Sequence, residues 1–146
     1  MNTLKQISVF ARNLPGKIKQ ITGLLSEAGI DIKSISVSSG GDFGVIKLIT
    51  DKPDESRSIL ESDGMTVSVN EVLTIEMPDT PGGLDKVAGI LAGYSINIEN
   101  ASGFVIEAGK RAAFIIEVKD PADALSKLKS SELKFLEAKD IIEPHG

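Results

Sequence analysis

The sequence predicts an α+β fold that consists of two β-α-β-β-α-β modules in tandem, and three observations lead to this prediction. First, the turn Asn13-Leu14-Pro15-Gly16 has a counterpart in Asp79-Thr80-Pro81-Gly82. Second, a strand-like run precedes each turn and a helix-like run follows it. Third, Gly29-Ile30-Asp31-Ile32 follows the first turn at the same offset at which Ser95-Ile96-Asn97-Ile98 follows the second. Such self-similarity at a fixed offset is typical of a duplicated unit.

Composition is that of an ordinary globular protein and argues against several function classes. The 146 residues are 41% hydrophobic and 25% charged, with a net charge of -5, whereas a nucleic-acid surface needs clustered Lys and Arg. The absence of Cys excludes disulfides, thiol catalysis and zinc–thiolate sites. No apolar run reaches membrane-spanning length, and no apolar segment typical of a signal peptide follows Met1. We therefore expect a cytoplasmic protein without a nucleic-acid or membrane partner.

In the first module, apolar spacing changes from strand-like to helix-like. Ile7 and Val9 alternate with polar neighbours, as on a strand with one buried face. Beyond Pro15 the apolar residues recur at helical spacing, and Gly29 ends that run. Pro15 is expected at the first helical position, with Asn13 as the cap. We expect strands over 4–11, 30–38, 44–50 and 65–69, and helices over 15–28 and 53–62.

The second module repeats this order almost at once, because only Asn70-Glu71 joins it to the first. We therefore predict domains at residues 1–70 and 71–146, and a joint this short predicts that they pack together. We expect strands over 72–77, 96–106, 112–118 and 134–142, and helices over 81–94 and 122–128, followed by a tail.

Catalytic chemistry has little support in the sequence. The single histidine, His145, lies next to the last residue, where a frayed tail is expected. No serine lies in a Gly-x-Ser-x-Gly turn, and no interior histidine could activate one. Asp42-Phe43-Gly44 matches a protein-kinase pattern, but the glycine-rich and catalytic loops that accompany it in kinases are missing. We therefore expect no enzyme activity, no cofactor and no metal site.

The two Pro-Gly turns have a structural and a functional interpretation. Structurally, each is a tight connection between a strand and a helix. Functionally, the unpaired N–H groups of a helix N-terminus suit a carboxylate, and Gly16 or Gly82 lets a ligand approach the backbone closely. The side-chain oxygen of Asn13 or Asp79 could accept a hydrogen bond from an ammonium group. A free α-amino acid carries both groups, so we predict an amino acid as the ligand.

Two further polar residues stand where the second strands begin. Asp31 and Asn97 suit a turn that leads into a strand. They are equally suited to contact a polar ligand, and the sequence leaves both interpretations open.

These motifs resemble the ACT domain, a small amino-acid-sensing module. The resemblance rests on Asn13-Leu14-Pro15-Gly16-Lys17-Ile18 with Gly29-Ile30-Asp31-Ile32, and on Asp79-Thr80-Pro81-Gly82-Gly83-Leu84 with Ile96-Asn97-Ile98. It covers nearly the whole chain as two tandem modules. The chain also resembles the small free-standing tandem-ACT proteins of prokaryotes, in which Asp-Phe-Gly opens the third strand of the first module, as Asp42-Phe43-Gly44 does here.

The resemblance implies that both modules are ferredoxin-like and that they pair side by side into an eight-stranded antiparallel sheet with helices on one face. It places the ligand at the seam between the first turn of one module and the second strand of the other. The implied ligand-binding residues are Asn13, Leu14, Pro15, Gly16, Lys17, Ile18, Asp31, Ile32, Asp42, Phe43, Asp79, Pro81, Gly82, Gly83, Leu84, Asn97 and Ile98. Because Gly83 replaces Lys17 and the second module lacks Asp-Phe-Gly, we expect unequal sites, with the better one in the first module.

We therefore predict a regulatory protein that senses a free amino acid, forms a homo-oligomer such as a dimer, and signals to another protein, with a metabolic enzyme as a candidate. One alternative is a regulatory subunit that docks onto a biosynthetic enzyme and resembles the small subunit of acetolactate synthase. A second is an enzyme, which the missing interior His and Cys disfavour. A third is a ferredoxin-like RNA binder, which would need exposed aromatic residues and a basic surface. The residues leave open which amino acid binds.

Overall fold

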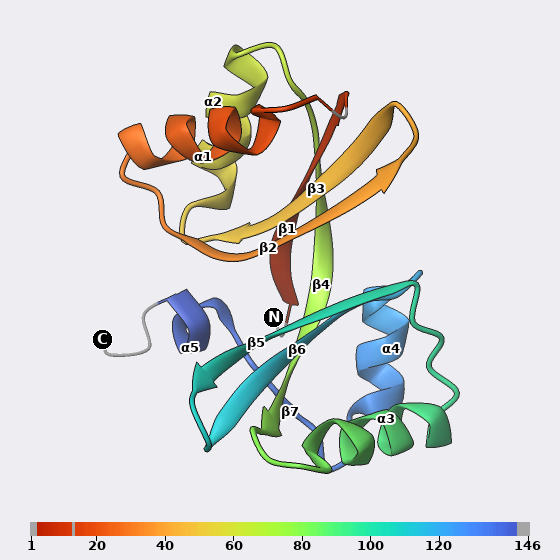
Figure 1. The fold of residues 1–146 in the computed structure, drawn as a ribbon. Helices are drawn as coiled ribbons and strands as arrows, with labels where there is room; N and C mark the ends of the chain where they lie inside the picture. Colours follow the sequence, from red (N-terminus) through yellow and green to blue (C-terminus); the bar gives the residue numbers. More distant parts are fainter. Residues whose placement is uncertain (1–2, 13, 143–146) are drawn as a thin grey trace. The chain divides into compact units, whose positions relative to one another are not determined.

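The computed structural model describes residues 3–12 and 14–142, which form seven strands and five helices (Figure 1). The strands are β1 (Thr3–Arg12), β2 (Ile32–Gly40), β3 (Phe43–Thr50), β4 (Thr66–Pro78), β5 (Asn100–Glu107), β6 (Arg111–Glu117) and β7 (Lys134–Phe135). The helices are α1 (Lys17–Glu27), α2 (Pro53–Ser62), α3 (Gly83–Gly93), α4 (Pro121–Leu128) and α5 (Ala138–Ile142). Within this described part, none of the helices is long and apolar enough to cross a membrane.

The chain divides into two compact units, which we call the first unit and the second unit. The first unit is Lys5–Asn70, and the second unit begins at Glu71 and also takes in the chain before Lys5. Each unit has the order β-α-β-β-α-β, so the predicted α+β class and the repeated ferredoxin-like modules are confirmed. The extents of the two domains, 1–70 and 71–146, stay a prediction.

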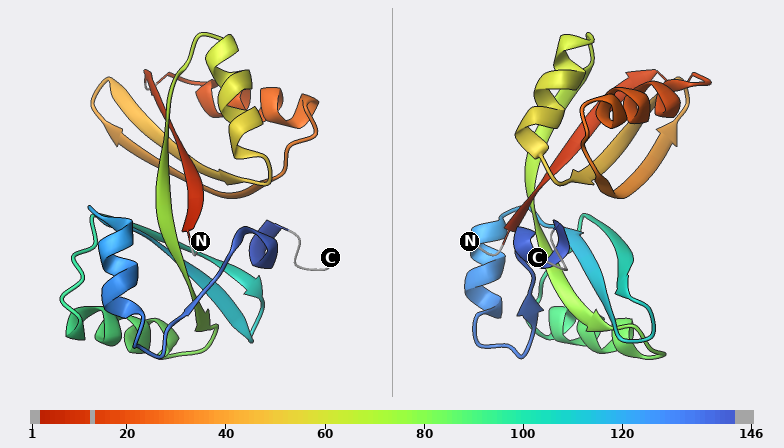
Figure 2. Two further views of the ribbon diagram at one scale, coloured as in Figure 1. Left: turned by 180° about the vertical axis from the view of Figure 1, so that it is seen from behind. Right: turned by 90° about the vertical axis from the view of Figure 1, so that its left-hand side faces the viewer.

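In the first unit the strands lie in the order β2-β3-β1-β4. β3 is antiparallel to β1 and to β2, with Ile46 opposite Val9 of β1 and Val37 of β2. Figures 1 and 2 show α1 and α2 on one face of this sheet. The core between helices and sheet is aliphatic, as the scarcity of aromatic residues predicts, and consists of Ile7, Val9, Ile21, Leu25, Ile30, Ile46, Leu48, Leu60 and Val67.

The second unit repeats this strand order as β5-β6-β4-β7. β6 is antiparallel to both neighbours, with Ile116 opposite Leu73 of β4 and Ala101 of β5. α3 and α4 cover one face, as α1 and α2 do in the first unit (Figure 2). The core consists of Leu73, Ile75, Val87, Leu91, Ile116, Ala124 and Leu128.

The strand β4 is longer than the sequence predicts. It continues without a break through Asn70 and Glu71, which are exposed strand residues. Neither residue is a Gly or Pro, which would favour a turn, so nothing in the local sequence ends the strand. The predicted strands over 65–69 and 72–77 are therefore one strand. The described part of the chain has seven strands rather than eight, so an eight-stranded sheet is not confirmed.

Two other predicted strands have different bounds in the structure. The predicted strand over 96–106 begins only at Asn100. The predicted strand over 134–142 consists of the short β7 followed by α5. The backbone N–H of Glu137 donates to Asp140 Oδ2 over 2.8 Å, which is the contact that the third residue of a helix makes back to the capping residue. Apolar residues at 135, 136, 141 and 142 fit both patterns, and this contact favours the helix.

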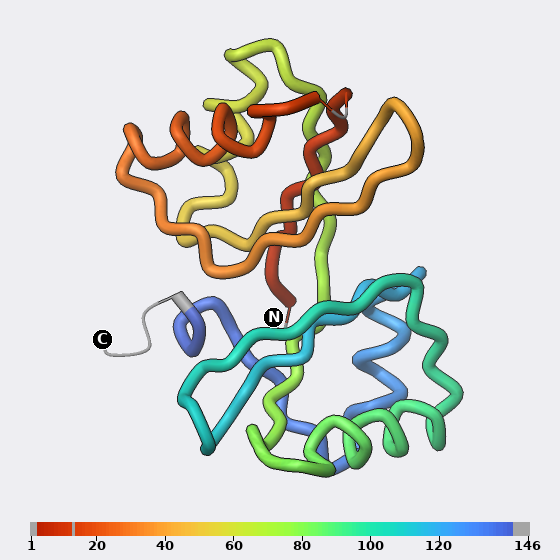
Figure 3. The backbone as a smooth tube through the Cα atoms, in the orientation of Figure 1, coloured from red at the N-terminus to blue at the C-terminus, as the bar shows by residue number. Residues whose placement is uncertain are grey.

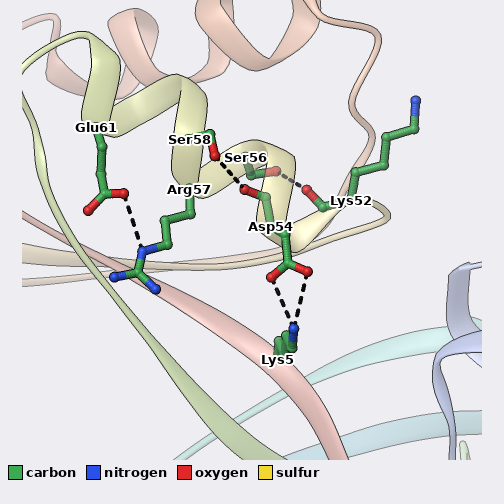
Figure 4. A network of polar contacts seen from close by, with 7 residues as sticks. All are labelled: Lys5, Lys52, Asp54, Ser56, Arg57, Ser58 and Glu61. Atoms are coloured by element: carbon green, nitrogen blue, oxygen red, sulfur yellow. Dashed lines mark hydrogen bonds and ion pairs between the residues drawn. The ribbon is translucent and has the colours of Figure 1, made fainter.

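Polar contacts link α2 to β1 within the first unit (Figure 4). Lys5 Nζ lies 3.0 and 3.2 Å from the two carboxylate oxygens of Asp54. Arg57 and Glu61 pair along α2 over 3.3 Å. All four side chains are about half exposed or more, and such pairs typically contribute less than about 1 kcal/mol. These contacts therefore orient α2, while the aliphatic core supplies most of the stability.

Candidate functional site

Each Pro-Gly turn connects the first strand of a unit to its first helix. Gly16 precedes α1 with φ 85°, and Gly82 precedes α3 with φ 89°. Both values lie in the left-handed region, which glycine adopts without the steric cost that other residues meet. The prolines lie one residue before these glycines, so the predicted placement of Pro15 and Pro81 at the first helical position is wrong. The fixed φ of proline still suits the turn itself.

The helix N-termini at both turns lack a side-chain cap. No side chain accepts a hydrogen bond from the first N–H groups of α1 or of α3 within the described residues. The backbone fills part of the need, because Lys17 N–H donates to Leu14 O over 3.3 Å and Gly83 N–H donates to Thr80 O over 3.0 Å. The remaining N–H groups of each first turn can serve a carboxylate.

The two predicted ammonium acceptors have different outcomes. Asn13 lies outside the described residues. Asp79 Oδ2 accepts a hydrogen bond of 2.8 Å from Gly109 N–H, and Asp79 N–H donates to Lys110 O over 3.2 Å. Asp79 therefore joins the turn to the hairpin between β5 and β6. The sequence did not indicate Gly109 as its partner, because residues 30 positions apart meet only once the sheet has formed.

Charge distinguishes the two turns. The first turn of α1 contains no acidic residue, whereas the first turn of α3 contains Asp85. Lys17 adds a positive charge at the start of α1, where its Nζ lies 3.1 Å from Gln20 Oε1. Since a helix N-terminus favours negative ligands, an acid in its first turn already satisfies part of that preference. The turn of the first unit is thus the more attractive one for a carboxylate.

Apolar side chains surround the turn of the first unit. Leu14 and Ile18 are 54% and 45% exposed. Phe43 pairs with Arg12 at the end of β1, so the β2–β3 hairpin reaches the same end of the unit as the turn (Figure 3). Asp42 and Phe43 thus lie at that end of the unit, and their contact with a ligand at the turn stays a prediction. The second unit offers Leu84, which is 48% exposed.

A hollow of about 440 Å³ lies at this end of the first unit. Phe10, Ser38 and Val45 line it from three paired strands, together with Phe43. Phe10 is not among the residues predicted for the site. The sequence does carry a signal for it, because Phe10 alternates with the buried Val9 and so points to the other face of the sheet.

Gly83, which occupies the position of Lys17, has a packing role. A Cβ at Gly83 would clash with Pro78 O, so no larger residue fits there without displacing the backbone. The difference between the two turns at this position therefore has a steric cause, and a role of Gly83 in ligand binding stays a prediction.

The residues at the starts of the second strands lie away from the turns of their own units. α1 has 11 residues and is therefore about 16 Å long. The turn stands at its N-terminal end, while Asp31 and Ile32 follow its C-terminal end. The same separation holds for Asn97 and Ile98 beyond α3. Neither unit alone brings its turn and these residues to one ligand.

No metal centre is present among the described residues. They contain no group of three or more His, Cys, Asp or Glu side chains arranged to hold a metal ion. The site at each turn is thus made of backbone N–H groups, one lysine in the first unit and apolar side chains.

Several solved structures share this fold over most of the chain. Protein BT0572 from Bacteroides thetaiotaomicron is 26% identical, with a TM-score of 0.87 and coverage of 97% of this chain and 98% of that chain. The ligand-free regulatory subunit of aspartate kinase from Thermus thermophilus is 19% identical, with a TM-score of 0.63 and coverage of 88% and 92%. The aspartokinase alpha and beta subunits are 20% identical, with a TM-score of 0.54 and coverage of 88% and 95%. The comparison with curated proteins gave no match.

A family model agrees with the fold and with the duplicated turn. The model of the ACT domain pair matches residues 2–144, which is nearly the whole chain. Both Pro-Gly turns, both helix pairs and all described strands fall inside this match. The chain therefore belongs to the family of ACT domain pairs.

Proposed function

We propose that the chain senses a free amino acid, which binds with its carboxylate at the N-terminus of α1. ACT domains are regulatory amino-acid-binding modules, and this chain carries a pair of them. One observation carries the proposal: α1 begins with a left-handed Gly16, has no acidic residue in its first turn, and receives no side-chain cap from the residues that the structure describes. A carboxylate there would accept from backbone N–H groups and gain from the helix dipole.

The surroundings of the turn support an amino acid with an apolar part. Leu14 and Ile18 stay exposed beside the turn and could cover a side chain of the ligand. Lys17 adds a positive charge close to the proposed position of the carboxylate. The turn of the second unit, with Asp85 in its helix, is the weaker site in this proposal.

The proposed site is completed by a second module. Because Asp31-Ile32 and Asn97-Ile98 lie at the far ends of their own helices, a ligand at one turn meets such a segment only where another module supplies it. We place the ligand at such a seam. The protein itself has no enzyme activity in this proposal, acts in the cytoplasm, and transmits the bound state to another protein.

A thermal scan with the twenty amino acids tests the proposal. A ligand that binds only the native state stabilises it by about 2.7 kcal/mol at one hundred times its Kd. For a chain of this size the midpoint should rise by about 5–10 °C. If none of the twenty amino acids raises the midpoint, the sensor proposal fails.

Charge reversal at the turn locates the site. Lys17→Glu places an acid at the first helical position, which a helix tolerates well, but it repels a ligand carboxylate. We expect it to abolish most of the midpoint rise. Lys52→Glu, at the start of α2 in the same unit, is the matched control and should keep the rise. If Lys17→Glu and Lys52→Glu change the midpoint rise equally, the ligand does not bind at this turn.

Gly16→Val is less informative, since a β-branched residue at φ 85° strains the turn whether or not ligand binds.

Docking onto an enzyme is the alternative, and exposed apolar side chains favour it. Phe10, Val37 and Phe43 are exposed on the first unit. A similar fold belongs to a regulatory subunit of aspartate kinase. In this alternative the chain binds a biosynthetic enzyme such as acetolactate synthase. Affinity capture with the full chain as bait, with and without amino acids, distinguishes the two: a stable enzyme partner without any amino-acid effect supports docking alone.

A further inference from the structure

β2 in the first unit and β5 in the second are edge strands at matched places in the fold. Among the described residues β2 pairs with β3 and β5 pairs with β6, and each lies at the far end of its strand order from β4, the strand whose residues belong to both units. The strand registers match Ile35 of β2 with Ala101 of β5. They match Val37 with Gly103 in the same way. The outer edge of each strand is therefore open to another copy of this chain.

The two edges differ in shape at these matched positions. Ile35 and Val37 are 44% and 53% exposed and project from β2. At the same places β5 has the exposed Ala101 and Gly103, which cover little of the backbone. Two β5 edges side by side would leave unfilled space above these small residues and lose the contacts of a packed interface. β2 beside β5 fills that space with the larger side chains, so the shapes favour pairing of a first unit with a second unit.

The units also differ in charge near the ends of these strands. Glu99, just before β5, is the one charged residue from position 95 to position 100. At the matched position the first unit has Lys33, whose Nζ pairs with Asp31 Oδ2 over 2.7 Å, so the charges at the start of β2 are balanced. The start of α1 carries Lys17 and no acid, whereas the first turn of α3 contains Asp85. The negative segment before β5 therefore suits the start of α1 and would be repelled by the start of α3 in another second unit.

Antiparallel pairing brings these complementary ends together. Two similar units that lie side by side around a twofold axis have matched strands that run in opposite directions, so the start of β5 lies beside the end of β2. The end of β2 leads into the hairpin whose Phe43 pairs with Arg12, and it lies at the same end of the first unit as the Pro-Gly turn. The start of β5 in another copy, with Asn97 and Glu99, is thus placed beside the turn before α1.

We propose that the amino-acid site at the turn of the first unit is completed by the second unit of another copy, which supplies Asn97 and Glu99. The ligand carboxylate lies at the start of α1 near Lys17, while the ligand ammonium pairs with Glu99 and donates to the side-chain oxygen of Asn97. The assignment of Glu99 rests on the function proposed above, whereas the pairing of β2 with β5 does not depend on a ligand.

Mixing two blocked variants tests the pairing without ligand. Ile35→Lys places a charge on the β2 edge, and Ala101→Lys places one at the matched position of β5. Either variant alone should raise the dissociation constant of self-association by about tenfold or more, since the core of an interface disfavours an unpaired lysine. An equimolar mixture should associate again, because one chain keeps an unaltered β2 and the other an unaltered β5.

Sedimentation velocity at micromolar concentrations measures each variant and the mixture. Ser58→Lys, at an exposed position of α2, is the matched control and should leave self-association unchanged. The thermal midpoint of each variant shows that it folds.

Matched substitutions test the role of Glu99. The probe is the amino acid that raises the thermal midpoint most in the scan of twenty. Glu99→Gln removes the proposed partner of the ligand ammonium and should weaken binding of this amino acid by about tenfold, as expected for a hydrogen-bonded charge pair. Lys33→Gln changes the charge at the matched position of the first unit and should leave the affinity unchanged.

The two parts of the proposal fail separately. The pairing is overturned if the unmodified chain stays a monomer, if Ala101→Lys leaves self-association unchanged, or if the mixture of blocked variants stays dissociated. The role of Glu99 is overturned if Lys33→Gln, and not Glu99→Gln, weakens the amino acid. A scan in which no amino acid raises the midpoint overturns the proposed function and with it the role of Glu99, while the result of the mixing experiment still decides the pairing.

Discussion

Glycine has two different roles at the turns of this protein. Gly16 and Gly82 provide a left-handed backbone, and the space around their missing side chains is open. Gly83 instead provides space, because Pro78 O lies where its Cβ would be. The first role was predictable from the Pro-Gly pattern. The second was not, because contact with a carbonyl five residues earlier depends on the angle between β4 and α3.

Adding one methyl group to α3 separates these roles. Gly83→Ala should lower the free energy of unfolding by about 1–3 kcal/mol, the usual cost of overpacking. Gly89→Ala, an exposed position in the same helix with open space at its Cβ, should raise it by about 0.5–1 kcal/mol. Urea denaturation of the two variants measures both changes. Equal effects would show that the contact at Pro78 relaxes without cost.

Asp79 is expected to stabilise a hairpin whether or not it binds ligand. Asp79→Ala removes the acceptor for Gly109 N–H and should cost about 0.5–1.5 kcal/mol. Hydrogen exchange at Gly109 should become faster at the same time. Asp42→Ala, in the hairpin of the first unit, is the control variant for hydrogen exchange at Gly109. Unchanged exchange at Gly109 in Asp79→Ala would contradict this role.

At the scale of elements, periodicity predicted most strands and helices, and local exceptions set their ends. The aliphatic cores contain the residues that alternation and helical spacing indicated, such as Ile7, Val9 and Leu25. The start of β5 was mispredicted because Ile96 and Ile98 alternate like strand residues, while the backbone contact that leads into β5 begins only at Glu99, whose N–H donates to Glu117 O over 2.9 Å. The segment 136–142 was mispredicted because its apolar residues fit both a strand and a helix, and the contact of Asp140 Oδ2 with Glu137 N–H at the start of α5 is not visible in that spacing.

Two hydrogen bonds between Asp31 and Asp51 are expected to matter more than a surface ion pair in the same unit. Asp31 N–H donates to Asp51 Oδ1 over 2.9 Å, and Asp51 N–H donates to Asp31 O over 3.1 Å. Asp51→Ala should increase hydrogen exchange over residues 31–33 and lower stability by about 0.5–1.5 kcal/mol, since a backbone donor loses its partner. Asp54→Ala, which removes the exposed pair with Lys5, should cost less than about 1 kcal/mol and leave that segment unchanged. Faster exchange at 31–33 in both variants would argue that α2, not the pair of contacts between Asp31 and Asp51, controls the segment.

At the scale of the whole molecule, the family, the duplication and the turns were predictable from sequence, and the joint was not. Motifs repeat along the chain, so duplication can be recognised without a structure. β4 is continuous because no strand-ending residue stands at Asn70-Glu71. The lack of such a residue is not a motif that can be recognised in the sequence. The residues named for the ligand at the turns and at the second strands stay a prediction, since a seam requires two modules.

Self-association is the last prediction, and β2 is the strand that we expect to carry it. β2 stands at the end of the strand order and exposes Ile35 and Val37. Edge strands with exposed apolar residues favour further pairing. Val37→Lys should lower the dimer fraction in sedimentation velocity at micromolar concentrations. Ser36→Lys, on the opposite face of the same strand, should change it less. A strict monomer for the unmodified chain would contradict the prediction.

The continuous β4 also restricts how the length of the chain can vary. Val67 lies in the core of the first unit, and Leu73 and Ile75 lie in the core of the second. Successive side chains on a strand point to opposite faces, and these three core residues are separated by even numbers of positions. Deleting one residue between them would move the next core residues to the opposite face of the strand, while deleting two would not. Homologous chains should therefore differ here by even numbers of residues, or carry a bulge where the number is odd.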